Sequence, residues 1–315
     1  MRHVWILGSG GLLGSAMKQS LSEEKQVRIF TEPTPLSWAD KTALNRELCE
    51  AVDCFAKIIG KDDSWEVYWM AGRSIMSSER TELEQETSIL SLLLERIDTH
   101  PSICVAEGTI IFASSAGGVY AGSTEETISE LSVVSPLSAY GEEKLKQEEL
   151  IRTWAKSHPT LSVLIARIST LYGPKQSQGK KQGLLTHIAR CILRKEPVEI
   201  FVPFDTIRDY IHVRDAVEEI KRALENVRGT HAVTMKIVAS EEPTTVAQII
   251  QLFRHVTRVR PRIVTSSNPR SSHYARRMCF KSSIFPSKET KKRTSLLLGI
   301  AEILSAERLA MAKGK

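Results

Sequence analysis

The stretch that decides the fold is HVWILGSGGLLG, residues 3–14. Its first five residues form an apolar run typical of a buried strand, and a helical pattern begins at Leu12. Glycines at positions 8, 11 and 14 allow a tight turn, close backbone approach to a pyrophosphate and close helix packing, and the helix N-terminus offers unpaired N–H groups to the anion. The alternative is a plain strand–helix turn. We therefore predict a dinucleotide phosphate site formed by Gly8, Gly10, Gly11, Leu12, Leu13 and Gly14.

Strand patterns alternate with helical patterns over about two thirds of the chain, which is typical of a parallel sheet covered by helices. The predicted strands are 3–7, 27–30, 66–72, 108–115 and 161–169, and the predicted helices between them are 12–21, 41–59, 79–97 and 139–156. Beyond Gly173 the pattern is mixed, with short strands near 198–202 and 233–239 and helices at 184–194, 215–226 and 244–257. We predict an α/β fold, a Rossmann-type doubly wound parallel sheet with a smaller mixed C-terminal substrate lobe. Residues 1–173 would be the dinucleotide-binding domain, and 174–315 mainly the substrate-binding lobe, with some segments returning to the Rossmann sheet.

Charge is unevenly distributed along the 315 residues. The net charge is +6, yet residues 251–315 alone carry 15 Lys and Arg against 3 Asp and Glu. A basic region of this kind can face nucleic acid, anionic lipid or a phosphate-bearing substrate, or be a solvated surface. No RNA-binding aromatic motif, zinc ligand set or helix-turn-helix pattern accompanies it, so we expect no nucleic-acid partner.

The cysteines and the apolar runs indicate a cytoplasmic protein. The five cysteines are odd in number and scattered, without a metal-ligand spacing, so we expect reduced thiols and no metal site. No apolar run approaches the roughly 18–20 residues of a membrane span, and the first residues lack a signal-peptide cleavage site.

Tyr140 and Lys144 lie four residues apart at the start of a predicted helix, which places the phenol and the ammonium on one face. A nearby ammonium, helped by an oxidised nicotinamide, stabilises a phenolate whose pKa is ordinarily about 10. The pair therefore suits acid–base chemistry beside a nicotinamide. Alone, this spacing also fits a solvent-facing helix pair.

Six segments in order make the chain resemble the extended short-chain dehydrogenase/reductase family, the NAD-dependent nucleotide-sugar epimerases, reductases and dehydratases. They cover roughly residues 1–220. The segments are the glycine turn 8–14, Met-Ala-Gly at 70–72, SSAGGVY at 114–120, SPLSAY at 135–140 with Lys144, RISTLYGP at 167–174 and RDYIHVRD at 208–215.

The resemblance implies that Tyr140 is the acid/base, that Lys144 is its electrostatic partner and that a serine binds the reacting sugar oxygen. Ala116 occupies the position where many relatives place that serine or threonine, so we assign the role to the adjacent Ser115. Gly117 and Gly118 replace the acidic pair of the dehydratases, and dehydration is therefore not expected. The implied cofactor contacts also include Asp40, Ala71, Gly72, Ser114, Tyr140 and Lys144, and the implied substrate contacts are Ser115, Ala116, Arg208 and Arg276.

Several assignments stay open between two alternatives. Asp40 would either contact the adenine edge or cap a helix. Glu32 would hold the ribose of NAD, or Arg28 would favour the 2′-phosphate of NADP, so the cofactor is NAD or NADP. Arg208 would reach the diphosphate of a nucleotide sugar, with Arg270, Arg276 and Arg277 available to add charge.

The predicted function is hydride transfer at a sugar carbon, as an epimerase or as a ketoreductase. The alternative is a dinucleotide-binding sensor or scaffold with weak catalysis. The partners implied are a nucleotide sugar and a second copy of the chain, in a homodimer formed through residues 79–97 and 139–156.

Overall fold

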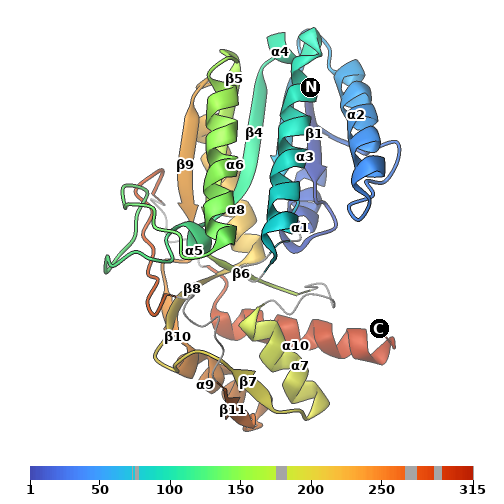
Figure 1. The fold of residues 1–315 in the computed structure, drawn as a ribbon. Helices are drawn as coiled ribbons and strands as arrows, with labels where there is room; N and C mark the ends of the chain where they lie inside the picture. Colours follow the sequence, from blue (N-terminus) through green and yellow to red (C-terminus); the bar gives the residue numbers. More distant parts are fainter. Residues whose placement is uncertain (73, 75–77, 175–182, 267–274, 287–292, 315) are drawn as a thin grey trace.

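A six-stranded parallel sheet forms the amino-terminal part of the computed structural model, which describes residues 1–72, 74, 78–174, 183–266, 275–286 and 293–314 (Figure 1). The strand order is β2-β1-β3-β4-β5-β9. The bounds are β1 (Arg2–Leu7), β2 (Val27–Phe30), β3 (Ser64–Trp69), β4 (Gly108–Ser115), β5 (Leu161–Ile168) and β9 (Val233–Val238). The chain leaves β1 outward to β2 and returns to β3 on the other side of β1. Doubly wound sheets bind ligands at such a reversal, outside the carboxyl ends of the strands. In this protein the reversal lies between β1 and β3.

Helices cover both faces of this sheet (Figure 1). One face packs against α2 (Lys41–Ile58), α3 (Arg80–Asp98) and α6 (Ala139–Ala155), and the short α4 (Pro101–Val105) follows α3. The other face packs against α1 (Leu12–Ser22) and α8 (Val213–Val227). Alternate residues of β1 enter the two layers, because successive side chains of a strand point to opposite faces. The predicted doubly wound α/β fold is confirmed.

The C-terminal part forms a smaller lobe beyond the carboxyl ends of the strands (Figure 1). Its three-stranded sheet has the order β10-β8-β6, antiparallel between β10 and β8 and parallel between β6 and β8. The bounds are β6 (Thr170–Tyr172), β8 (Ile207–His212), β10 (Pro243–Thr245), β7 (Val198–Ile200) and β11 (Ile263–Thr265), with helices α7 (Leu184–Arg194), α9 (Val246–Thr257) and α10 (Leu296–Ala312). Buried apolar residues of the three helices form one core with β7 and β8.

Two segments after residue 173 belong to the main sheet. β9 pairs with β5, and α8 packs beside α1 on the sheet. The sequence analysis expected some segments after residue 173 to return to the Rossmann sheet, and β9 and α8 do so. α10 was not predicted, and it buries Ile300, Ile303 and Leu304 in the core of the lobe.

All five cysteines are free thiols in this structure. Within the described ranges, no helix is both long enough and apolar enough to cross a bilayer.

Asp40 begins α2, and its carboxylate accepts hydrogen bonds from the backbone N–H groups of Thr42 (2.9 Å) and Ala43 (3.0 Å). The capping alternative is thus confirmed, whereas contact with an adenine edge stays a prediction.

We expect Asp40→Ala to lower the free energy of unfolding by about 0.5–2 kcal/mol, because two helix N–H groups lose their acceptor. Urea unfolding measures this change. Asp40→Asn keeps the acceptor and serves as the control, so an equal loss in both variants would contradict the capping explanation.

Candidate active site

The glycine turn joins β1 to α1 with a backbone that only glycine accommodates. Gly8 has φ +90°, and a Cβ there would lie 2.6 Å from the carbonyl oxygen of Met70 and 2.5 Å from the nitrogen of Ala71. A Cβ on Gly14 would lie 2.2 Å from the oxygen of Gly8, and Gly11 N–H donates to that oxygen at 2.9 Å. The predicted turn therefore exists, and it packs against the carboxyl end of β3.

The N-terminus of α1 is open to an anion. Gly11 caps the helix without a side-chain hydrogen bond, so no cap side chain occupies the first N–H groups, which include those of Leu12 and Leu13. A Cβ built on Gly10 meets no atom within 4 Å, which leaves open space beside the turn. These features fit the pyrophosphate of a dinucleotide.

Tyr140 lies against the end of β4. Ser138 caps α6 by accepting from the N–H of Gly141 at 3.2 Å, which places Tyr140 in the first turn. A Cβ on Gly118 would lie 3.1 Å from the Tyr140 ring, so the absence of a side chain there lets the ring approach. Ser115, whose hydroxyl accepts from the N–H of Gly118 at 3.1 Å, lies beside Tyr140 and acts to lower its pKa. The structure thus brings together the two hydroxyl groups that were assigned to catalysis.

Lys144 lies one turn further along the same face. Its Nζ is 5.9 Å from the centre of the Tyr140 ring and 5.0 Å from that of Phe112. It donates to Oε1 of Gln147 at 3.0 Å. The side chain is only 6% exposed, and this burial lowers the pKa of Lys144, against the opposing influence of Glu86, Glu148 and Glu143.

Burial raises the pKa of Tyr140 to about 12, and the nearby Ser115 hydroxyl counteracts part of that rise. The phenol is therefore protonated at neutral pH and ready to donate. Forming the phenolate requires additional positive charge beside it, which an oxidised nicotinamide ring would supply.

Glu86 of α3 is a site residue that the sequence analysis missed. Its Oε1 accepts from the N–H of Ser74 at 2.9 Å, and its Oε2 would lie 3.6 Å from a Cβ on Gly72. Its charge acts on both Tyr140 and Lys144. It therefore links the end of β3 to the Tyr–Lys pair. On the sequence, Glu86 looks like any other glutamate on the polar side of this helix.

Two residues assigned to ligand contact lie behind the site. The hydroxyl of Ser114 donates to Oε1 of Glu148 at 2.6 Å, and Glu148 forms a buried ion pair with Arg167 at 2.6 Å. Ala116 has no exposed surface and belongs to a buried cluster at the start of α5 (Ala116–Val119). Contact between Ala116 and substrate stays a prediction, and the strand end turns the Ala116 side chain into the core. Contact between Ser114 and the cofactor stays a prediction. The Ser114 hydroxyl already donates a hydrogen bond to Glu148.

The arginines predicted to bind a diphosphate come from two adjacent segments. Arg208 lies on β8, and its guanidinium donates to the carbonyl of Ile207 at 2.7 Å. The N–H of Ile207 donates to the carbonyl of Arg276 at 2.9 Å, so the segment around Arg276 runs beside β8. The Arg276 side chain forms an exposed ion pair with Asp205. A phosphate would therefore have to compete with Asp205 for Arg276. Arg270 lies outside the described residues.

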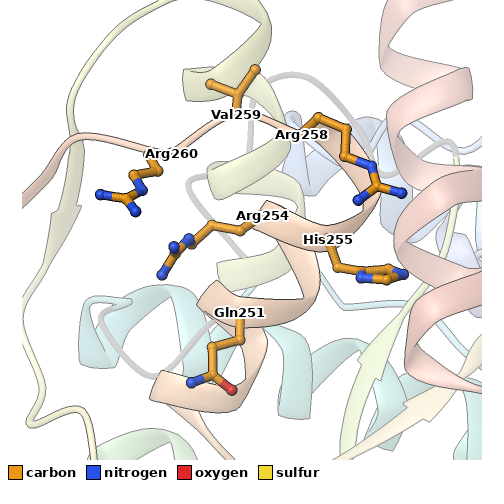
Figure 2. Close-up of a pocket in the computed structure, with 6 residues that line it drawn as sticks. All are labelled: Gln251, Arg254, His255, Arg258, Val259 and Arg260. Carbon is orange, nitrogen blue, oxygen red and sulfur yellow. The ribbon is translucent and has the colours of Figure 1, made fainter.

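Part of the basic C-terminal charge gathers away from Tyr140, around a surface hollow of about 380 Å³ at the end of α9. Figure 2 shows Arg254 and Arg260 extending to one side of this helix end, and Arg258 and His255 to the other. Cations at a helix C-terminus complement the helix dipole. This arrangement agrees with a solvated basic surface.

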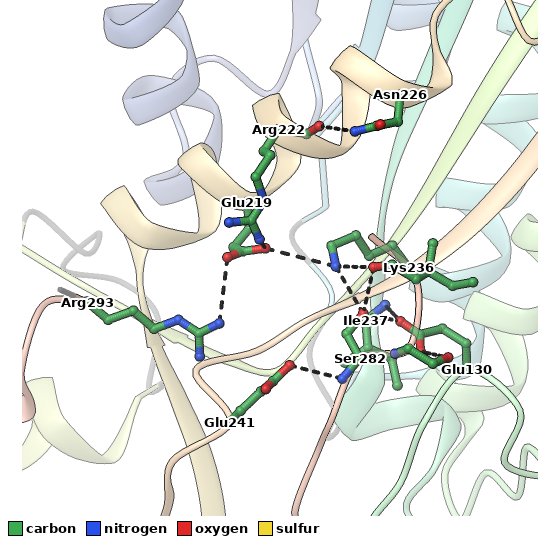
Figure 3. Close-up of polar contacts among 11 residues, drawn as sticks. Glu130, Glu219, Arg222, Asn226, Lys236, Ile237, Glu241, Ser282 and Arg293 are labelled. Carbon is green, nitrogen blue, oxygen red and sulfur yellow. Dashed lines mark hydrogen bonds and ion pairs between the residues drawn. The ribbon is translucent and has the colours of Figure 1, made fainter. Parts of the chain in front are cut away.

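A buried polar network holds the loop that precedes Tyr140 (Figure 3). The carboxylate of Glu130 accepts from the N–H of Ile237 at 2.7 Å, from the hydroxyl of Ser282 at 2.5 Å and from the N–H of Ser283 at 2.7 Å. Lys236, which is 1% exposed, donates to Ser282 at 2.9 Å and lies 3.9 Å from Glu219. Three distant segments, the loop, β9 and residues around 282, are joined here.

The fold and the site together define a Rossmann-type protein with a glycine-rich turn and a Tyr–Lys pair at the carboxyl edge of its sheet. The model of the NAD dependent epimerase/dehydratase family matches residues 4–237, and the chain belongs to this family.

Three similar proteins illustrate the relationship. An uncharacterized UDP-glucose epimerase of Bacillus subtilis is 26% identical over 250 residues, which are 70% of this chain and 72% of that protein. A dTDP-4-dehydro-6-deoxyglucose reductase of Escherichia coli is 33% identical over 135 residues, 40% of this chain and 42% of that protein. The solved structure of MoeE5 in complex with UDP-glucuronic acid and NAD has a TM-score of 0.77 at 23% identity, and covers 98% of this chain and 99% of its own. The last similarity confirms the fold.

Proposed function

We propose that this chain is an NAD(P)-dependent nucleotide-sugar epimerase or ketoreductase in which Tyr140 is the acid/base. The observation that carries the proposal is that Tyr140 and Ser115 meet at Gly118, with Lys144 one helical turn away. Membership of the family and the similarity to nucleotide-sugar enzymes of both kinds support it.

In the proposed reaction, Ser115 binds the sugar oxygen and Tyr140 exchanges a proton with it. Oxidation of a hydroxyl sends its proton to the Tyr140 phenolate, and reduction of the resulting ketone takes that proton back. Lys144 stabilises the phenolate electrostatically. When bound, the nicotinamide cofactor accepts or supplies the hydride. An epimerase returns the hydride to the opposite face of the sugar, whereas a ketoreductase performs only the reducing half.

The end of β2 favours NAD over NADP in this proposal. The indole N–H of Trp5 donates to Oε1 of Glu32 at 2.8 Å, which holds this carboxylate just after the strand. An acidic group there binds a ribose hydroxyl and repels a 2′-phosphate. Arg28 lies earlier, opposite His3 in the strand register, and is therefore further from the glycine turn.

Native mass spectrometry of the purified full chain, followed by turnover assays with UDP- and dTDP-sugars, tests the proposal. An epimerase should retain NAD and show no net cofactor turnover, and a ketoreductase should consume reduced cofactor in proportion to product. A protein that binds dinucleotide but converts no nucleotide sugar would instead be a sensor or scaffold.

A homodimer formed through α3 and α6 stays a proposal. These helices lie side by side, since Thr87 donates to Glu143 at 2.6 Å. No described residue of either helix is a large exposed apolar side chain, so the contact between copies would be largely polar. Sedimentation analysis should give twice the 35.2 kDa of one chain, and a mass of one chain would overturn the dimer.

We expect Glu86→Gln to move the pH dependence of kcat to lower pH. Burial is the main cause of the raised pKa of Tyr140, and the Glu86 carboxylate raises it further because negative charge disfavours the phenolate. Removing that charge lowers the pKa of Tyr140, so the rise of kcat that accompanies phenolate formation should occur at lower pH. The measurement is kcat against pH in the oxidising direction. Glu84→Gln, at an exposed position of the same helix, should leave the pH of this rise unchanged.

A further inference from the structure

We propose that Asp98, Cys104 and His158 form a binding site for a divalent transition metal such as Zn²⁺. The carboxylate oxygen, the thiol sulfur and the imidazole nitrogen lie within 4.8 Å of one another. They come from the end of α3, from α4 and from the connection between α6 and β5. The scattered cysteines predicted no metal site, because the fold alone brings these three positions together.

The imidazole of His158 is oriented for ligation. Its Nδ1 lies 2.8 Å from the carbonyl oxygen of Trp154, and its Nε2 lies 2.9 Å from Oδ1 of Asp98. The Trp154 ring packs on the imidazole with centroids 4.1 Å apart, and its indole N–H donates to the same Asp98 oxygen at 2.8 Å. Metal-binding histidines commonly donate their second nitrogen to a carbonyl in this way, which fixes the ring and directs the other nitrogen at the metal. Trp154 therefore orients two of the three ligands.

The surroundings favour a cation. Both α3 and α6 end near these residues, at the edge of the sheet farthest from the lobe (Figure 1). The sulfur of Cys104 lies 3.7 Å from the carbonyl oxygen of Ile97 and 4.0 Å from that of Asp98. Carbonyl groups at helix C-termini carry the negative end of the helix dipole. Two such ends add negative potential to a thiol and a carboxylate.

The spacing suits a small metal ion after a modest contraction. Bond lengths of about 2.0–2.1 Å to nitrogen or oxygen and about 2.3 Å to sulfur place the ligands of a tetrahedral zinc ion roughly 3.3–3.6 Å apart. The widest separation here needs to shrink by little more than ~1 Å. Asp98 can move, since its side chain is 44% exposed. Water would fill the fourth position.

The site would be structural and not catalytic. Trp154 and Tyr140 lie at opposite ends of α6, about 21 Å apart along the helix axis at about 1.5 Å per residue. The metal would tie α3, the helix that carries Glu86, to the end of α6, the helix that carries Tyr140.

Isothermal titration of the full chain with ZnCl2, after dialysis against a chelator, tests the proposal. We expect one ion per chain, and Cys104→Ser and His158→Gln should each weaken binding at least as much as the roughly 10–100-fold caused by losing an outer-shell partner. Cys49→Ser, a partly exposed cysteine of α2, is the control and should bind as the parent does. Substitution with Co²⁺ should give a sulfur-to-metal absorption band that Cys104→Ser removes.

Circular dichroism checks that each variant is folded. If His158→Gln does not fold, Cys104→Ser still decides, because the thiol makes only long contacts to carbonyl oxygens. Absence of zinc binding, or binding that both site variants retain, would overturn the proposal. In that case His158 and Asp98 form an ordinary ion pair.

Discussion

Replacing Tyr140 by phenylalanine is expected to lower kcat by about 10²–10⁴-fold, the usual contribution of a positioned general acid or base. The variant loses the atom that would exchange a proton with the sugar oxygen, while Ser115 keeps the hydrogen bond that it accepts from the Gly118 N–H. The glycine turn is untouched, so the dissociation constant of the dinucleotide should change little. Steady-state assays with a nucleotide sugar, and cofactor titration followed by fluorescence, measure the two quantities separately.

Tyr68→Phe is the matched control for this variant. Tyr68 is a fully buried tyrosine of β3 whose hydroxyl donates to Glu66 at 2.7 Å, within the sheet and away from the site. Loss of the hydroxyl should cost about 1.5–3 kcal/mol of stability, as a hydrogen bond to a charged group does, and leave kcat nearly unchanged. Retention of full activity by Tyr140→Phe would show that another group moves the proton, and the proposed mechanism would then be wrong.

Glu130→Ala should have the largest effect on stability, a loss of about 3–5 kcal/mol in the free energy of unfolding, as for a broken buried ion network. The change removes the acceptor of the Ile237 and Ser283 N–H groups and of the Ser282 hydroxyl. It also removes a negative charge near the buried ammonium of Lys236 (Figure 3). Chemical denaturation at neutral pH measures the loss.

The same network makes a pH-dependent contribution. Burial alone would raise the pKa of Glu130, but hydrogen bonds from Ser282, Ile237 and Ser283 outweigh it and hold the pKa below its ordinary value. A carboxyl with a depressed folded-state pKa contributes its full stabilisation above the unfolded pKa, about 4.3, and loses it as the pH falls through the folded value. The difference between the parent and Glu130→Ala should therefore narrow in acid.

Glu125→Ala is the control for the network. Glu125 lies on the same loop but is exposed, and its carboxylate accepts a hydrogen bond from the Ser132 hydroxyl at 2.6 Å. Its removal should change stability by no more than about 0.5 kcal/mol, as is usual for surface substitutions. Equal losses in the free energy of unfolding of Glu130→Ala and Glu125→Ala would show that the buried network does not stabilise the protein.

Local sequence patterns were sufficient to predict the elements whose conformation depends on residues close together in the chain. The turn at 8–14 follows from glycine stereochemistry, and the helical pattern of 139–156 predicted the helix that carries Tyr140. The return of some later segments to the main sheet was expected, but the mixed pattern around β9 does not reveal which sheet this strand joins.

The sequence by itself determined the sheet, the phosphate turn and the Tyr140–Lys144 pair, because each depends on residues close together along the chain. Only the tertiary structure decided that Ser115 reaches Tyr140, that Glu86 stands beside the pair and that Ala116 is buried. It alone also brought Asp98, Cys104 and His158 together. The physical reason is that electrostatic, hydrogen-bonding and coordination contacts depend on distance in space, and helix packing against the sheet sets those distances between residues far apart in the chain.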